Sequence, residues 1–288
     1  MIDVSIVILT YKEAPEVLAA CLGAVRASAP GGDSSRREVI IVDNSGSAAT
    51  ERLVHEYLPT ATYLANAENR GFAAAVNQGM RLATGRYILL LNPDTVVPPD
   101  AIERMVQHMD ADVDVGIGSC IIRYPNGELQ PSIRRFPKLL DQLLILFKVP
   151  HVVSRLKAVD EYMMTDVDAM KTQDVDSIMG AFMMIRKSVI DEIGMFDERY
   201  FIWFEEVDYC KMAHDAGFKI RHYADVEIVH HKGHTFNQLA TIRKQKWIRE
   251  SMRKYFAKHE GWAATAVLWL LAPVFIALAY VTAVIKRG

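Results

Sequence analysis

The chain has 288 residues, 51% of them hydrophobic, and a formal net charge of −2 at pH 7. This length suits one large α/β domain or two ordinary domains, and the composition is that of a globular protein. The near-neutral charge gives no case for nucleic-acid binding. Cys21, Cys120 and Cys210 are far apart and form no Cys-x-x-Cys pair. Their spacing argues against a disulfide framework or a zinc site and fits a reducing compartment.

The N-terminal part of the chain alternates between strand and helix patterns. Short runs rich in β-branched residues predict strands at 4–10, 39–44, 61–66, 87–92 and 115–124. Helix patterns lie between some of them, at 17–25, 71–85 and 99–109. Strands separated by single helices pair in parallel through right-handed crossovers. We therefore expect an α/β fold with a mostly parallel, Rossmann-like central sheet flanked by helices.

The second half of the chain is less regular. Residues 139–174 mix apolar and charged side chains with weak periodicity, as a flap or mobile insertion would. A strand-turn-helix pattern resumes at 176–198, and a helix closed by Gly217 follows. A last strand within 220–235 ends in histidines.

The C-terminal segment is strongly apolar. Trp262 to Val284 contains no charged residue, and its 23 residues would reach about 34 Å as a helix, enough for a hydrocarbon core of about 30 Å. We expect a membrane helix, either spanning or re-entrant because Pro273 lies in its middle. The basic stretch 243–258 before it predicts that the rest of the chain faces the cytoplasm. A buried helix preceded by a solvated basic helix is the alternative.

Three parts of the chain follow from these patterns. They are an α/β domain at 1–240, a basic amphipathic juxtamembrane segment at 241–260 and the apolar helix at 261–288.

Polar residues collect where the predicted strands end. In parallel sheets ligands bind beyond the carboxyl ends of the strands. Asp43 could accept hydrogen bonds from a nucleotide base or ribose, or could simply form a turn. Arg70 and Gly71 stand just before a helix, where exposed amides and a guanidinium would suit a phosphate. Asn77 lies inside that helix, and a solvent-facing asparagine is its plain interpretation.

Asp94 follows the apolar run "YILLLNP" at the end of a strand. A carboxylate there could bind Mg²⁺ or Mn²⁺ that bridges two phosphates, since such metals often take only one or two protein carboxylates. Charge on a departing diphosphate would then be neutralised. A turn before "TVVPPD" is the alternative.

A second acidic cluster stands in "YFIWFEEVDYC". Glu205, Glu206 and Asp208 crowd the start of a helix, where the helix dipole favours negative charge. A solvated helix start would explain them, but the aromatic neighbours favour a sugar-binding wall beside a general base. Further along, His230 could contact a metal or a diphosphate, whereas His231 and His234 could equally be surface residues.

Taken together, these motifs resemble the family 2 glycosyltransferases with the GT-A fold, particularly bacterial rhamnosyltransferase-like members. The matching pieces occur in the family's order: "VSIVILTYKE", "IIVDNSG", "NRGFAAAVNQG", "LLLNPDTVV", "GELQPSIRRFP", "MGAFMMIRKSVIDEIGMFDE", "FEEVDYC" and "VHHKGHT". The resemblance implies inverting transfer of a sugar from a nucleotide-diphosphate donor.

The resemblance also implies roles for individual residues. Asn92-Pro93-Asp94 stands where the family commonly has Asp-x-Asp, so Asp94 would bind the metal together with His230. Glu205-Glu206-Val207-Asp208 matches the family's Glu-Asp-x-Asp pattern and puts Glu206 in the place of the usual catalytic aspartate, with Asp208 and Glu205 as competitors. Gly180 and Trp203 are expected on the acceptor side. The expected nucleotide-sugar site comprises Thr10, Tyr11, Glu13, Asp43, Arg70, Gly71, Asn77 and Asn92.

The donor expected from this resemblance is dTDP-rhamnose, with UDP- and GDP-sugars left open. The apolar C-terminus suggests a lipid-linked acceptor such as a polyprenyl-diphosphate saccharide, and a place on the cytoplasmic face of the inner membrane in cell-envelope polysaccharide synthesis. Self-association of the chain is left open. The alternative function is a non-catalytic sugar-nucleotide-binding or scaffold protein, which the departures at Asn92 and Glu206 favour.

Overall fold

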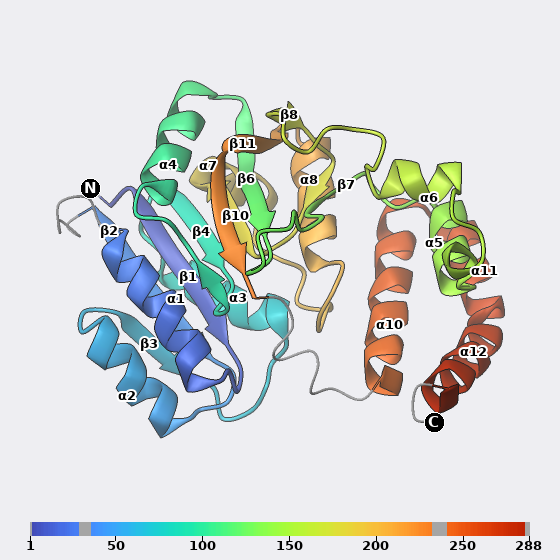
Figure 1. Ribbon diagram of the computed structural model, residues 1–288, viewed down its shortest axis with the longest axis horizontal. Helices are drawn as coiled ribbons and strands as arrows, with labels where there is room; N and C mark the ends of the chain where they lie inside the picture. Colours follow the sequence, from blue (N-terminus) through green and yellow to red (C-terminus); the bar gives the residue numbers. More distant parts are fainter. Residues whose placement is uncertain (1, 29–35, 232–240, 286–288) are drawn as a thin grey trace.

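The computed structural model describes residues 2–28, 36–231 and 241–285 (Figure 1). Their main sheet has the strand order β3-β2-β1-β4-β10-β6-β11-β5, with β8 also paired to β11. Its strands are β1 Val4–Thr10, β2 Arg37–Asp43, β3 Thr62–Ala65, β4 Tyr87–Leu91, β5 Thr95–Val96, β6 Val115–Arg123, β8 Gln173–Asp174, β10 Phe182–Arg186 and β11 Lys219–His230. A small second sheet pairs β7 Ile133–Arg134 with β9 Ser177–Ile178.

Helices cover the sheet and extend beyond one end of it (Figure 1). The helices of the sheet region are α1 Pro15–Ala27, α2 Ala48–Tyr57, α3 Phe72–Leu82, α4 Ala101–Ala111, α7 Lys187–Ile193 and α8 Glu205–Asp215. Those beyond it are α5 Leu139–Leu146, the 3₁₀ helix η2 Val149–His151, α6 Lys157–Tyr162, α10 Thr241–His259, α11 Trp262–Leu270 and α12 Ala272–Ile285.

The sheet is mostly parallel, as the sequence predicts. Strand β1 pairs in parallel with β2 and β4, and β11 pairs in parallel with β6. Strand β10 departs from this pattern because it runs antiparallel between β4 and β6. It enters the sheet from the long excursion through β7 and β9 rather than through a crossover helix, so the sheet is mixed at this position.

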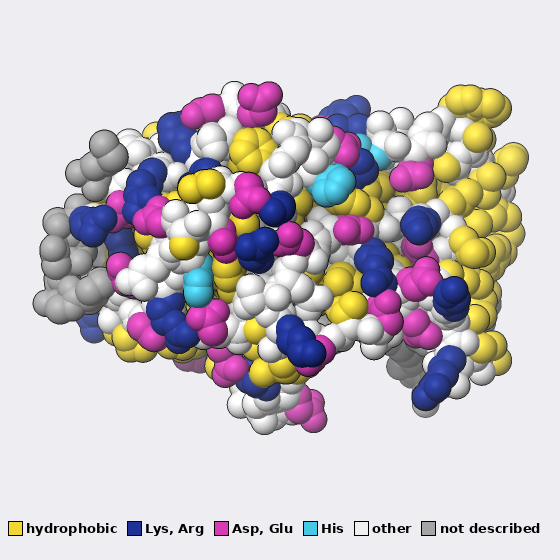
Figure 2. Space-filling model, turned by 90° about the horizontal axis from the view of Figure 1, so that it is seen from above, with side chains coloured by type: hydrophobic (Ala, Val, Ile, Leu, Met, Phe, Trp, Pro, Cys, Tyr) yellow, Lys and Arg dark blue, Asp and Glu magenta, His cyan; other side chains and the backbone are white. Residues whose placement is uncertain are grey.

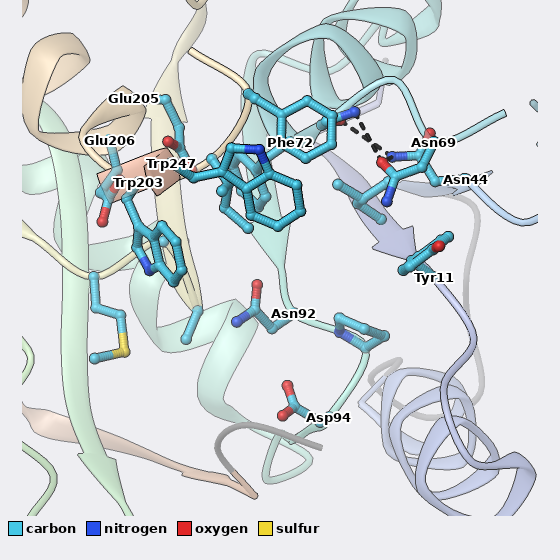
Figure 3. Close-up of a pocket in the computed structure, with 18 of the residues that line it drawn as sticks. Tyr11, Asn44, Asn69, Phe72, Asn92, Asp94, Trp203, Glu205, Glu206 and Trp247 are labelled. Carbon is cyan, nitrogen blue, oxygen red and sulfur yellow. Dashed lines mark hydrogen bonds between the residues drawn. The ribbon is translucent and has the colours of Figure 1, made fainter. Parts of the chain in front are cut away.

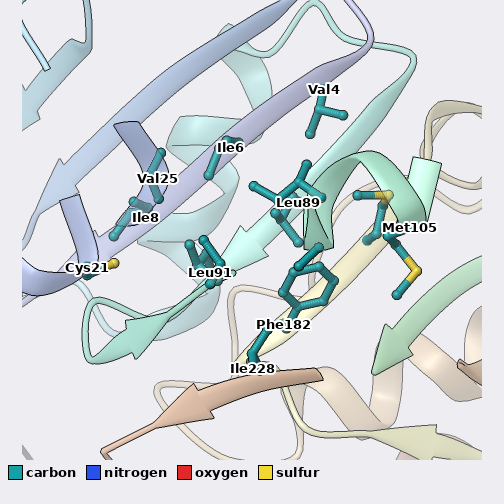
Figure 4. Packing of buried hydrophobic residues seen from close by; sticks show 14 of the residues in the cluster. Val4, Ile6, Ile8, Cys21, Val25, Leu89, Leu91, Met105, Phe182 and Ile228 are labelled. Carbon is teal, nitrogen blue, oxygen red and sulfur yellow. The ribbon is translucent and has the colours of Figure 1, made fainter. Parts of the chain in front are cut away.

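The central strands are apolar on both faces because helices cover both. On one face, Ile6 and Ile8 of β1 pack with Leu89 of β4 and with side chains of α1 and α4 (Figure 4). On the other face, Val7 and Leu90 pack toward α3, α7 and α8. Continuous apolar runs of this kind are typical of strands buried on both sides.

Two elements differ from the sequence prediction. Helix α2 was missed because it is polar overall and Val54 is its one buried side chain, so its apolar face is narrow. Ser47 caps it by accepting a hydrogen bond from the Thr50 amide at 3.4 Å. The flap at 139–174 contains the ordered helices α5 and α6 and the strand β8.

The C-terminal helices also correct an expectation. The apolar stretch forms two helices, α11 and α12, rather than one, because Pro273 has no amide hydrogen to continue α11 and its ring would crowd a carbonyl of the preceding turn. Across the described residues, no helix combines the length and apolarity that a membrane crossing requires. The expectation of a single spanning helix is therefore not supported, and the re-entrant alternative stays a prediction.

Helix α10 is more than a solvated basic helix. Its Met252, Tyr255 and Phe256 are buried against Tyr200 and Phe204, which belong to the loop before α8. The helix therefore packs onto a loop that also builds the main pocket.

Candidate active site

A cavity of about 440 Å³ lies beyond the carboxyl ends of β1 and β4 (Figure 3). Tyr11 and Asn92 line it from the strand ends. Trp203 and Glu206 line it from the start of α8, and Trp247 lines it from α10. The cavity thus stands where ligands bind in open α/β sheets.

Asp94 reaches the cavity from the short link between β4 and β5. The residue is buried, with 7% of its surface exposed. Its backbone carbonyl accepts a hydrogen bond from the His231 amide at 2.9 Å. Pairing of β5 with the end of β11 brings His230 beside it, with Nε2 of the imidazole 3.1 Å from the Asp94 Oδ1. The structure therefore brings together the two residues that the sequence predicts as metal ligands.

Gln130 orients the imidazole of His230. Its Oε1 lies 3.1 Å from Nδ1, and an amide oxygen can only accept, so Nδ1 carries the hydrogen. In the neutral ring Nε2 then keeps its lone pair, beside Asp94 Oδ1 and 3.2 Å from the Asn92 amide nitrogen. With this tautomer, the Asp94 carboxylate and the His230 imidazole could together hold a cation, with the ring oriented by a neighbour that does not bind the ion.

This donor pair fits Mg²⁺ or Mn²⁺. Such ions keep several ligands for water and phosphate oxygens and need only one or two from the protein. In the described ranges no group of three potential protein ligands occurs, so a bound diphosphate would have to complete the coordination. Gln130 lies within the motif "GELQPSIRRFP" and was not predicted as a site residue.

Asp43 does not line the cavity. Its carboxylate accepts hydrogen bonds from the Ser45 amide at 2.8 Å, the Ser47 amide at 2.9 Å and the Tyr63 hydroxyl at 2.8 Å. These contacts hold the turn after β2, as the alternative interpretation had it. The neighbouring Asn44 lines the cavity instead.

Asn44 ties the turn to the loop before α3. Its Nδ2 donates to the Asn69 Oδ1 and to the Gly71 carbonyl, both at 3.1 Å (Figure 3). Gly71 has a φ of +84°, and a Cβ on it would lie 2.6 Å from the Phe201 carbonyl oxygen. Only glycine fits this position, because both the backbone conformation and the close approach exclude a side chain.

Three other predicted nucleotide-binding residues lie outside the cavity lining. Thr10 is buried at the end of β1, where its carbonyl accepts from the Asn44 amide at 2.9 Å. Arg70 is exposed. Asn77 is buried and joins α3 to the segment before α8 by donating to the Phe196 carbonyl at 2.8 Å, so the solvent-facing interpretation was wrong. The remaining predicted contacts on this side, Tyr11, Glu13, Gly71 and Asn92, line the cavity.

The second wall holds the pair Glu205 and Glu206. It follows Trp203 and Phe204, whose φ angles of 63° and 68° are uncommon for large side chains and turn the chain sharply into α8. Burial raises the pKa of Glu206 to about 7. Burial, and then the neighbouring Glu206, raise the pKa of Glu205 well above its usual range. Within the described part of the chain, the Oε2 atoms of both residues have no hydrogen-bond partner.

Both glutamates hold a proton more readily than an exposed glutamate does, because burial disfavours the charged form. The pKa of Glu206, about 7, lies in the range where a general base works well. Gly180, predicted on the acceptor side, lines the same wall, and a Cβ on it would lie 4.0 Å from the Glu206 Cβ.

Asp208, the third candidate for the base, does not line the cavity. It is 1% exposed, and its two oxygens lie 2.7 Å from Lys258 Nζ and 2.7 Å from His259 Nε2. The Tyr200 hydroxyl donates to it at 3.3 Å. The structure places Asp208 in a link between α8 and α10, outside the cavity lining.

Helix α10 adds two residues that the sequence analysis did not assign to the site. Arg243 and Trp247 line the cavity, and the ring centroids of Trp247 and Phe201 lie 4.7 Å apart. Aromatic residues interleaved with basic ones were the available signal, but they were interpreted as a juxtamembrane segment.

Comparisons with known proteins relate this geometry to a family. A rhamnosyltransferase of Mycobacterium tuberculosis (strain CDC 1551 / Oshkosh), N-acetylglucosaminyl-diphospho-decaprenol L-rhamnosyltransferase, is 24% identical over 249 residues, or 81% of this chain and 79% of that protein. Rhamnosyltransferase WbbL of Escherichia coli (strain K12) is 25% identical over 232 residues, or 78% of this chain and 84% of that protein.

The fold has a solved counterpart. The structure of mannosyltransferase PcManGT from Pyrobaculum calidifontis, in complex with GDP-Man and Mn²⁺, matches 99% of this chain and 75% of its own with a TM-score of 0.61 and 20% identity. This likeness supports the α/β GT-A fold. The family model described as "Glycosyl transferase family 2" matches residues 5–194, well over half of the sequence. The chain belongs to glycosyl transferase family 2.

Proposed function

We propose that the chain transfers a sugar, with inversion, from a nucleotide-diphosphate donor to a hydroxyl of a lipid-linked saccharide. One observation carries the proposal: the pair Asp94 and His230 and the base candidate Glu206 line a single cavity from different walls. A diphosphate and an acceptor hydroxyl could then meet across one space.

In the proposed reaction Glu206 removes the proton of the acceptor hydroxyl. The hydroxyl oxygen forms a bond to the anomeric carbon while the bond from that carbon to the diphosphate oxygen breaks on the opposite face. The electron pair of the broken bond leaves with the nucleotide diphosphate. Glu206 ends the step protonated, and attack from the opposite face inverts the anomeric configuration.

Asp94 and His230 would hold a divalent cation, Mg²⁺ or Mn²⁺, which would neutralise negative charge on the diphosphate as it leaves. On the proposed donor side, Gly71 lets the loop before α3 pack closely on Phe201, and the Asn44–Asn69 network holds that loop beside the cavity. Arg70 remains a proposed contact on the exposed side of that loop.

The relatives support particular substrates. Both the mycobacterial and the E. coli relatives are named as rhamnosyltransferases, so dTDP-rhamnose is the proposed donor. The mycobacterial name specifies a decaprenol-linked acceptor, which supports a polyprenyl-diphosphate saccharide here. Trp203 and Trp247 offer aromatic faces for the acceptor sugar. The proposed location is the cytoplasmic face of the inner membrane.

Calorimetric titration of dTDP-rhamnose, with and without Mn²⁺, tests the donor half of the proposal beside a product assay. We expect Mn²⁺-dependent binding together with transfer to a polyprenyl-diphosphate acceptor. Binding without transfer to any lipid acceptor would favour the non-catalytic sugar-nucleotide-binding alternative.

A further inference from the structure

One end of the molecule exposes a broad apolar surface. Figure 1 places α5, α11 and α12 at this end, and Figure 2 shows hydrophobic side chains covering it. We call this surface the apolar platform and define it by six exposed residues: Phe147, Trp262, Trp269, Leu270, Val274 and Ile276.

The apolar platform is continuous rather than a set of scattered side chains. The ring of Phe147, just after α5, packs edge-on against Phe275 of α12 with centroids 4.9 Å apart. Phe275 and Leu268 are buried beneath the surface in one cluster with the apolar residues of α10. Leu270 is 78% exposed and Trp262 is 84% exposed. Patches of this kind on soluble monomers usually mark a binding surface.

The composition of the platform favours a lipid surface as the partner. Between Trp262 and Ile285 the sequence contains no Asp, Glu, Lys, Arg or His. Trp269 carries the guanidinium of Arg253 over its ring, with the Arg253 Cζ 4.2 Å from the ring centroid. A tryptophan with a cation at the edge of an apolar face suits the boundary between acyl chains and phosphate headgroups.

The charge of α10 points the same way. This helix carries many Lys and Arg residues, and Glu250 is its one acidic residue. Cationic side chains beside an apolar face attract anionic lipids and add to the binding that apolar burial provides.

The lengths of the two helices determine how they would lie. With 9 residues α11 is about 14 Å long, and with 14 residues α12 is about 21 Å long, each short of a hydrocarbon core of about 30 Å. We propose that the apolar platform inserts into the interfacial layer of a bilayer with anionic headgroups, so that α11 and α12 lie in the membrane surface and do not cross it.

This docking would place the cavity relative to the membrane. Helix α10 lines the cavity with Arg243 and Trp247 near its start, and its Tyr255 and Phe256 pack beneath the apolar platform. This inference rests on the proposed function, which supplies the lipid-linked acceptor. It adds the surface that would bring the cavity to that lipid.

Vesicle flotation with the full chain tests the proposal. The vesicles contain phosphatidylcholine alone or phosphatidylcholine with phosphatidylglycerol. The platform variant combines Trp269→Glu with Leu270→Glu, and the matched control combines Leu82→Glu with Val113→Glu, which are exposed apolar positions outside the platform. We expect the wild type and the control to float, best with phosphatidylglycerol, and the platform variant to lose about tenfold or more of its vesicle binding.

Circular dichroism and thermal melting of all three proteins show whether they are folded. A wild type that fails to float, or a folded platform variant that floats as well as the control, overturns the proposal. A third outcome also overturns it: light scattering shows a wild-type dimer, the platform variant is a monomer, and the wild type does not bind vesicles. A second copy of the chain would then cover the platform. If the wild type floats but transfers no sugar to a detergent-dispersed acceptor, the proposed function fails and the docking stands.

Discussion

Replacing Glu206 with glutamine tests the proposed base most sharply. The amide keeps the shape of the side chain but cannot accept a proton from the acceptor hydroxyl. Removing a general base typically slows a reaction about 10²- to 10⁴-fold, so we expect a fall of that order in kcat. Donor binding should change little, because Glu206 and the Asp94–His230 pair belong to different walls of the cavity.

The raised pKa of Glu206 adds a pH dependence. The base acts when deprotonated, so activity should rise as pH rises through the folded-state value of about 7. A group with a pKa of 7 goes from about one-tenth to about nine-tenths ionised between pH 6 and pH 8, which predicts an increase of about tenfold in wild-type kcat/KM. The residual activity of Glu206→Gln should lack this rise.

Steady-state kinetics from pH 5.5 to pH 8.5 measure both effects, with Glu192→Gln on the exposed side of α7 as a control for the same chemical change. We expect the control to retain the wild-type rate and profile. Near-normal turnover by Glu206→Gln, or an unchanged pH limb in that variant, would refute the assignment of Glu206 as the base.

Three further substitutions test other parts of the site. Asp94→Asn should weaken Mn²⁺-dependent donor binding by about tenfold or more in calorimetry, while thermal melting stays near the wild-type value. An unchanged Mn²⁺ dependence would remove Asp94 from the cation site. Gly71→Ala should destabilise the fold by about 1–3 kcal/mol in urea unfolding, because of its φ and the Phe201 carbonyl, and full stability would contradict the close approach. Asp208→Asn should cost about 1–3 kcal/mol by the same measurement because it removes the charged partner of Lys258 and His259, although Lys258 keeps Asp197 at 3.6 Å. The pH profile of the remaining activity should keep its midpoint. A shifted midpoint would instead return Asp208 to the chemistry.

Much of the strand framework could be predicted from local patterns. Strands β1 and β4 are short apolar runs bounded by polar residues, and a parallel sheet places their ends together, which is why Tyr11, Asn92 and Asp94 meet in one cavity. Strand β10 could not be assigned its antiparallel direction in this way, because its pairing depends on the path of a distant excursion.

The side-chain roles were less predictable. Asp43 and Asn44 are neighbours in the sequence, and only the turn geometry shows that the carboxylate points into its own loop while the amide reaches the cavity. Asp208 likewise lies two residues from Glu206 but is held by Lys258 and His259, about fifty residues away. Contacts across such separations leave no periodic signal in the sequence.

The C-terminal error has a similar origin. The sequence shows that the stretch after Trp262 is apolar and that Pro273 lies in its middle, but it does not show that the two resulting helices are each too short to span. Nor does composition reveal that α10 packs against Tyr200 and Phe204 and so contributes Trp247 to the site.

Mass spectrometry of a polyprenyl-diphosphate saccharide incubated with the purified chain, dTDP-rhamnose and Mn²⁺ tests the central claim most directly. We expect the lipid to gain the mass of one deoxyhexose with the wild type and to gain almost none with Glu206→Gln. A lipid of unchanged mass with dTDP-, UDP- and GDP-sugars alike, from protein shown to be folded and to bind a donor, would contradict the account.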